Sequence, residues 1–87
     1  MRKSTHTAAY DALRAKLVAF RTSKKLTQRE LAKKLKRNWS VVARIETGER
    51  RLDIVELYWF CEALGIDSPK AAAEIMKSIR TAEKSEK

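Results

Sequence analysis

Four side chains in the middle of the chain are suited to recognition chemistry. Trp39, Ser40, Ala43 and Arg44 follow the spacing i, i+1, i+4 and i+5, so they would share one face of a helix. An indole, a hydroxyl, a methyl group and a guanidinium can together make the hydrogen bonds and apolar contacts by which proteins recognise base edges in DNA. The pattern therefore favours a nucleic-acid-binding surface in this part of the chain.

Positive charge is concentrated around these four residues. The 87-residue chain carries a formal net charge of +9. Residues 21–51 hold eleven basic and three acidic side chains, whereas residues 52–87 hold five basic and seven acidic ones. A polyanion is the natural partner of such a basic segment, so the imbalance favours nucleic acid over a basic face that is merely solvated.

Five helical segments are expected to position this surface. Apolar residues recur at helical spacing, and Gly (2) and Pro (1) are scarce. The expected helices span residues 8–22, 27–35, 39–47, 54–64 and 69 to 80 or 81. We therefore expect one small all-α domain at 8–81, between a flexible basic arm at 1–7 and a charged, frayed tail at 82–87.

Capping signals mark the ends of these helices. Thr27 and Asp53 are each followed by glutamate three residues later, which is the capping-box pattern. Asn38 and Ser68 are the other expected N-caps, and Gly48 is an expected C-terminal stop, as is the glycine at 65. The residues expected to form the core include Leu13, Leu17, Phe20, Leu31, Ala32, Leu35, Val41, Val42, Ile45, Ile54, Leu57, Phe60, Cys61, Leu64, Ala72, Ile75, Met76 and Ile79.

Other classes of protein find little support in the sequence. Cys61 is the only cysteine and His6 the only histidine, so neither a disulfide framework nor a metal site is expected. No cluster of acids suggests catalysis, so we expect no enzyme activity and no cofactor. The chain has no apolar run long enough to cross a membrane and no secretory signal, which makes the cytoplasm the expected location.

Three short segments together resemble the lambda-repressor-like family of helix-turn-helix proteins, also called Cro-type or XRE-type. They are Leu-Thr-Gln-Arg-Glu-Leu-Ala at 26–32, Val-Ala-Arg-Ile-Glu-Thr-Gly at 42–48 and Ala-Leu-Gly-Ile at 63–66. They are similar to the family patterns L-[ST]-Q-x-x-L-A, [IV]-x-x-[IWY]-E-x-G and A-L-G-[IV], in the same order and at the usual spacing. The resemblance implies a compact five-helix DNA-binding domain whose second and third helices form the helix-turn-helix.

The resemblance also implies a role for each matching residue. Trp39, Ser40, Ala43 and Arg44 match positions that face the bases. Arg21 and Glu46 match a partly buried ion pair that joins the first and third helices. Positions that approach DNA phosphates are matched by Gln28, Lys36, Arg37, Asn38, Thr47, Arg50 and Arg51.

Three of these residues have an alternative or depart from the family pattern. Arg44 fits a bidentate contact to guanine, but a phosphate contact fits it equally well. Trp39 is an unusual base-facing residue and could instead pack in the core or in an interface. Lys36 stands where the family usually has glycine, at a position that tends to need a positive φ, so it is expected to strain the turn.

A small DNA-binding domain of this kind commonly acts as a homodimer on a palindromic site. The sequence therefore predicts a sequence-specific transcriptional regulator, a repressor acting on double-stranded DNA and associated with the nucleoid when bound. The last helix is a candidate dimerisation element, and the candidate dimer residues are Tyr58, Trp59, Ile75, Met76 and Ile79. The alternative is an antitoxin or adaptor that binds a partner protein such as a toxin and uses DNA binding for autoregulation.

Overall fold

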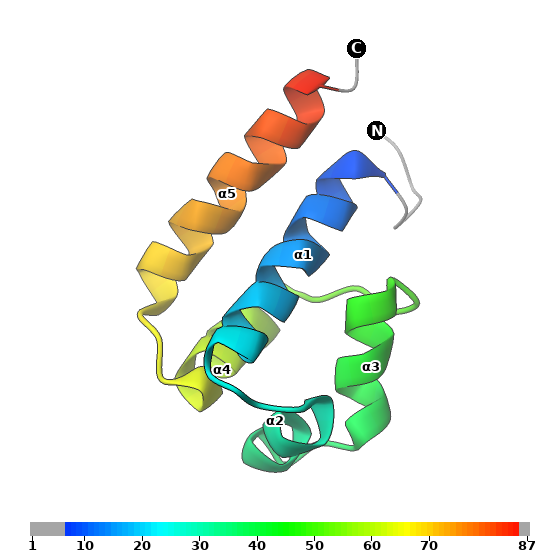
Figure 1. The fold of residues 1–87 in the computed structure, drawn as a ribbon, viewed down its shortest axis with the longest axis vertical. Helices are drawn as coiled ribbons and strands as arrows, with labels where there is room; N and C mark the ends of the chain where they lie inside the picture. The colour runs from blue at the N-terminus through cyan, green and yellow to red at the C-terminus, as the bar shows by residue number, and fades with distance from the viewer. Residues whose placement is uncertain (1–6, 86–87) are drawn as a thin grey trace.

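The computed structural model describes residues 7–85, which form five helices and no strand (Figure 1). The all-α class and the number of helices agree with the expectation from the sequence. The predicted arm lies outside the described residues except for Thr7, whose hydroxyl accepts from the amide of Tyr10 and caps the first helix. The helices are α1 (Ala8–Ser23), α2 (Gln28–Leu35), α3 (Trp39–Thr47), α4 (Ile54–Leu64) and α5 (Ser68–Ser85).

Helices α1 and α5 pack side by side along the length of the molecule, and α2 and α3 pack together near one end of α1 (Figure 1). Helix α4 contacts both α2 and α5, so it joins the two parts. Within residues 7–85, no helix is both long enough and apolar enough to cross a membrane.

The predicted capping signals are present at the starts of α2 and α4. The Thr27 hydroxyl accepts from the Glu30 amide at 3.1 Å, and the Glu30 carboxylate accepts from the Thr27 amide at 2.8 Å. Asp53 and Glu56 make the same reciprocal pair at 2.8 and 3.1 Å. These bonds satisfy amides in the first turn that have no acceptor within the helix, so the two starts are fixed locally.

Helix α5 differs from its prediction at both ends. Its first turn is capped by Asp67, whose carboxylate accepts from the Lys70 amide at 3.2 Å, and Ser68 is already helical. The helix then continues to Ser85, beyond the predicted end at 80 or 81. No Gly or Pro follows Pro69, and the Ala, Glu and Lys residues of the predicted tail are good helix formers, so nothing stops the helix there.

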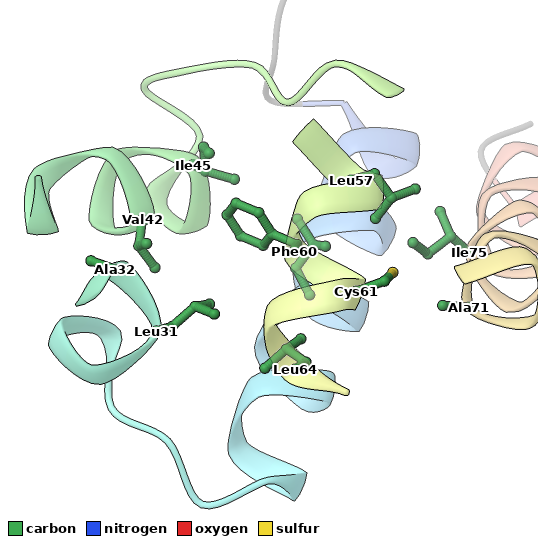
Figure 2. Close-up of a cluster of buried hydrophobic side chains, with 11 residues drawn as sticks. Leu31, Ala32, Val42, Ile45, Leu57, Phe60, Cys61, Leu64, Ala71 and Ile75 are labelled. Carbon is green, nitrogen blue, oxygen red and sulfur yellow. The ribbon is translucent and has the colours of Figure 1, made fainter. Parts of the chain in front are cut away.

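The core is arranged around α4, which buries two of its faces (Figure 2). Phe60 points toward α3, where Val42 and Ile45 lie, whereas Leu57 and Cys61 point toward Ile75 of α5. A helix that packs on two sides needs apolar residues on more than one stripe, which explains why Leu57, Phe60 and Cys61 are all buried, whereas Tyr58 and Trp59 lie on the exposed side of α4.

Two residues expected in the core lie on the surface instead. Ile54 is 69% exposed because it is the first residue of α4, and the buried residues of that helix begin only at Glu56. Met76 is 59% exposed because the buried stripe of α5 contains Ala71 and Ile75, which places Met76 to one side of it. Ala71 was not in the predicted core; its small side chain is fully inside.

Candidate nucleic-acid interface

Helix α3 presents the four predicted base-facing residues on its outward side. Trp39 and Arg44 are exposed, and Ser40 and Ala43 are half-buried. The opposite side of the helix carries Val42 and Ile45, which are both fully buried. The structure therefore brings these four side chains together on one accessible surface, and their contact with DNA stays a prediction.

Trp39 lies at the start of α3 and is 41% exposed, so it is not a core residue. The guanidinium carbon of Arg29, in the first turn of α2, lies 4.6 Å from the centroid of the Trp39 ring. This stack connects the first turns of the two helices of the helix-turn-helix. Arg29 was not among the predicted site residues, because nothing in the one-dimensional spacing relates positions 29 and 39.

A buried polar network fixes the orientation of α3 relative to α1. Arg21 donates to both carboxylate oxygens of Glu46, from Nε at 2.7 Å and from Nη2 at 2.9 Å. Its remaining Nη1 donates to the carbonyl oxygen of Leu26 at 2.8 Å. Such a bidentate pair has a narrow preferred geometry, so it restricts the angle between α3 and α1.

Gln28 belongs to the same network. Its Nε2 donates to Oε1 of Glu46 at 2.8 Å, so part of the side chain that was predicted to approach phosphate serves inside the protein. An amide nitrogen carries two hydrogens, and the second one remains suited to a phosphate. The backbone amide of Gln28 also lies in the first turn of α2, where amides have no acceptor within the helix and favour anions.

The turn between α2 and α3 has the strained geometry expected from the sequence. Lys36 adopts φ 57° and ψ 41°, the left-handed conformation that glycine takes most easily. The Arg37 amide donates to the Ala32 carbonyl at 3.0 Å and the Lys36 amide to that of Lys33 at 3.1 Å, which together make a Schellman motif. Lys36, Arg37 and Asn38 are all exposed, and the Asn38 side chain caps α3 by accepting from the Ser40 amide.

Arg50 has a structural contact that the sequence did not predict. Its Nη1 and Nη2 donate to the two carboxylate oxygens of Glu56 at 3.2 and 2.6 Å. The hydrogen bond from Arg50 holds the pKa of Glu56 below its ordinary value despite burial, and the same bond raises the pKa of Arg50. Arg50 was predicted to approach a phosphate, and although two of its nitrogens bond Glu56, its side chain is 35% exposed, so a phosphate contact stays a prediction.

The other predicted phosphate positions also have neighbours within the protein. The Thr47 hydroxyl lies 3.2 Å from the Arg44 carbonyl oxygen and 3.0 Å from a Glu49 carboxylate oxygen, and its single hydrogen is shared between these two acceptors. The guanidinium of Arg51 lies 5.5 Å from the Tyr10 ring, and that of Arg37 lies 5.6 Å from the Trp59 ring. Both arginines remain exposed, so these contacts orient them without burying their charge.

Within residues 7–85, no three His, Cys, Asp or Glu side chains come close enough together to hold a metal ion. Cys61 is buried in the core, and burial raises the pKa of its thiol, which keeps it in the unreactive protonated form.

Comparison with known proteins gives one family and one fold. The family model described as Helix-turn-helix matches residues 17–70, more than half of the chain. No curated protein matches the sequence. A solved XRE-family like protein from Pseudomonas syringae pv. tomato is 37% identical, with a TM-score of 0.75 over 80% of this chain and 85% of that one.

Two structures of the clp gene regulator ClgR from Corynebacterium glutamicum are also similar. One is 31% identical, with a TM-score of 0.68 over 78% of this chain and 88% of that one. The other is 29% identical, with a TM-score of 0.74 over 87% of this chain and 81% of that one. The matched residues include α2, the left-handed turn and α3, together with both members of the Arg21–Glu46 pair. The chain belongs to the XRE-type family of helix-turn-helix proteins.

Proposed function

We propose that this protein regulates transcription by binding double-stranded DNA in a sequence-specific manner, as a repressor that forms a homodimer on a palindromic operator. The observation that carries the proposal is the outward side of α3, where four side chains suited to base contacts lie together on a helix whose other side is buried. The segment that contains this helix has eight more basic than acidic side chains. Its positive field attracts a polyanion, and α3 has the size that the major groove admits.

In this mode of binding, α3 enters the major groove and α2 crosses the sugar–phosphate backbone. Arg44 donates to a guanine or a phosphate, Ser40 bonds a base or a phosphate, and Ala43 packs on a thymine methyl. Affinity that does not depend on sequence comes from Lys36, Arg37 and Arg51, from the amides of Gln28 and Asn38, and from Thr47. The Arg21–Glu46 pair holds α3 at the angle that the groove requires.

The surface that best supports a homodimer lies on α4 rather than on α5. Ile54, Val55, Tyr58 and Trp59 are each about half or more exposed, and their spacing places them on one side of the helix. Contiguous exposed apolar side chains of this kind mark interaction surfaces. Of the candidates on α5, Ile75 and Ile79 pack into the core, and Met76 alone is exposed.

Selection of DNA from a random double-stranded pool tests the proposal. The wild-type protein is expected to enrich a palindrome whose half-sites are about one helical turn apart, roughly 10 base pairs. Arg44→Ala is expected to remove the preference at one position of each half-site. Recovery of no preferred sequence at low salt would contradict sequence-specific binding.

Analytical ultracentrifugation on and off DNA tests the homodimer. Tyr58→Glu, in the centre of the α4 surface, is expected to abolish dimerisation and leave each domain folded. Lys77→Glu, on exposed α5, is the matched control and should leave the dimer intact. A wild-type protein that binds a palindrome as two independent monomers would refute the homodimer.

The same α4 surface supports the alternative, in which a partner protein such as a toxin binds there. The groove beside it, between α2, α3 and α4, has an apolar lining of Leu35, Val41, Trp59 and Phe60, with Arg37 and Glu56 at its charged part. Co-purification of a small partner that Tyr58→Glu releases, together with a monomeric free protein, would favour the alternative over the homodimer.

A further inference from the structure

The stack of Arg29 on Trp39 joins the first turns of α2 and α3, but an exposed contact of this kind contributes only a small amount to stability. Arg29 is exposed, and among residues 7–85 it forms none of the ion pairs that neutralise Arg14, Arg21 and Arg50. It lies in the first turn of α2, where the helix dipole disfavours a positive charge. The neighbouring Glu30 carboxylate is used by the capping box. Fold stability alone is therefore a weak reason for an arginine at this position.

The geometry of the stack determines which part of the guanidinium is left for a partner. Arg29 Cζ lies over the Trp39 ring, 4.6 Å from its centroid, a distance that fits an arrangement in which the ring covers one face of the guanidinium. The N–H donors of arginine point outward in the guanidinium plane, so contact with the ring does not consume them. The ring thus restricts the conformations of the Arg29 side chain while its N–H donors stay available. This lowers the conformational entropy that Arg29 would lose on binding a partner.

The position of the stack indicates what the N–H donors of Arg29 would bind. Trp39 is the first residue of α3, and the N-terminal residues of a recognition helix are the ones that reach base edges. The contact with the indole holds Arg29, a residue of α2, beside the first residue of α3. The planar pair of donors of a guanidinium matches the O6 and N7 acceptors of guanine in the major groove.

We infer that Arg29 is a specificity-determining residue that reads a guanine at one end of each half-site, and that Trp39 is its positioning residue. The inference rests on the proposed function, because it assigns a residue to the same DNA site. It also resolves the unusual tryptophan at a base-facing position: Trp39 serves as a platform for a longer side chain that reads the base.

Selection from a random DNA pool, followed by titration on the selected operator, tests this inference in the full chain. Arg29→Ala is expected to lose the guanine preference at one position and keep the rest of the palindrome, with operator affinity reduced roughly tenfold or more. Trp39→Ala should reduce the guanine preference at the same position. The double variant should bind the operator no more weakly than whichever of the two single variants binds it less tightly. Trp39→Phe keeps an aromatic platform and should retain most of the preference.

Lys33→Ala is the matched control, since Lys33 is an exposed cation on the same helix without a ring contact among the described residues. It should weaken binding to all sequences alike. Thermal melts of every variant check that each one is folded. Arg29 and Trp39 are both exposed, so substitutions at these positions should leave the fold intact. Arg29→Lys, which keeps the charge without the planar fork, should also lose the guanine preference.

Three results would overturn the inference. A wild-type motif that Arg29→Ala leaves unchanged would overturn it and leave the proposed function standing. A uniform loss of affinity in Arg29→Ala, with the salt dependence reduced by about one phosphate contact, would make Arg29 a backbone contact. A wild-type protein that selects no motif would overturn the proposed function and this inference together.

Discussion

Two arginine–glutamate pairs lie near the C-terminal end of α3, and they differ in sequence separation and in burial. Arg21 and Glu46 are 25 positions apart and have side chains that are 13% and 6% exposed. Arg50 and Glu56 are six positions apart and have side chains that are 35% and 11% exposed. The first pair also binds the Leu26 carbonyl and the Gln28 amide, whereas the second joins the loop after α3 to the start of α4.

The difference indicates which pair fixes the orientation of the outward, base-facing side of α3. A long-range pair that excludes water holds two helices at a fixed angle, and neither charge has an alternative partner in solvent if the other is removed. A short-range pair that is one-third exposed on its cationic side orders a loop, and solvent can replace much of it. We therefore expect the two pairs to respond unequally to the same kind of change.

The largest effect is expected from Glu46→Ala. It leaves the Arg21 charge buried without its carboxylate and removes the acceptor of Gln28 Nε2, so the free energy of unfolding should fall by about 3 kcal/mol. Urea denaturation followed by circular dichroism measures this loss. Glu49→Ala, an exposed carboxylate three residues further on, is the control and should cost no more than about 0.5 kcal/mol. A loss below about 1 kcal/mol for Glu46→Ala would show that the pair does not fix α3.

A smaller effect is expected from Glu56→Ala, since Arg50 can turn to solvent. The substitution also removes the carboxylate that caps the Asp53 amide, so we expect a loss of about 2 kcal/mol in unfolding free energy. Glu62→Ala, on the exposed side of the same helix, is the matched control. If Glu56→Ala costs more than Glu46→Ala, the contrast between the two pairs is reversed.

The pH dependence of stability should come in part from Glu56. Its pKa is lowered in the folded protein, chiefly by the Arg50 hydrogen bond, so its contribution is complete above the ordinary glutamate pKa of about 4.3. The contribution is lost as pH falls through the lowered folded pKa. Unfolding free energies of the wild type and Glu56→Gln should therefore differ by about 1 kcal/mol at pH 6 and converge at lower pH. A gap that stays constant down to the acid transition would contradict this assignment.

The smallest effect is expected at the turn between α2 and α3. Lys36→Gly relieves a left-handed lysine and should stabilise the protein by about 0.5–1 kcal/mol in thermal or urea unfolding. Lys25→Gly is the matched control, because Lys25 adopts the same conformation with φ 59° outside the helix-turn-helix. Both should stabilise alike, but only Lys36→Gly should reduce the salt dependence of DNA binding by about one contact. If Lys36→Gly and Lys25→Gly change the salt dependence of DNA binding equally, Lys36 does not contact a phosphate.

The elements of this fold could be predicted closely because their signals are local. The Thr27–Glu30 and Asp53–Glu56 boxes each involve residues three apart, and Gly48 marks the end of α3 by its own conformational freedom. The true end of α5 was missed because the chain carries no stop signal there, and Ala82 and its neighbours simply continue the helix. Ile54 and Met76 were misplaced because helical periodicity shows which residues share a face but not where the neighbouring helices cover it.

The candidate site divides in the same way. The sequence by itself determined that a basic helix-turn-helix would form and that Trp39, Ser40, Ala43 and Arg44 would share one side of its second helix, because these properties depend on local spacing and charge. Only the tertiary structure decided that Gln28 bonds to Glu46, that Glu56 neutralises Arg50 and that Arg29 stacks on Trp39. Each of these contacts joins different helices or a loop and a helix, and side chains brought together by packing leave no periodic trace in the chain.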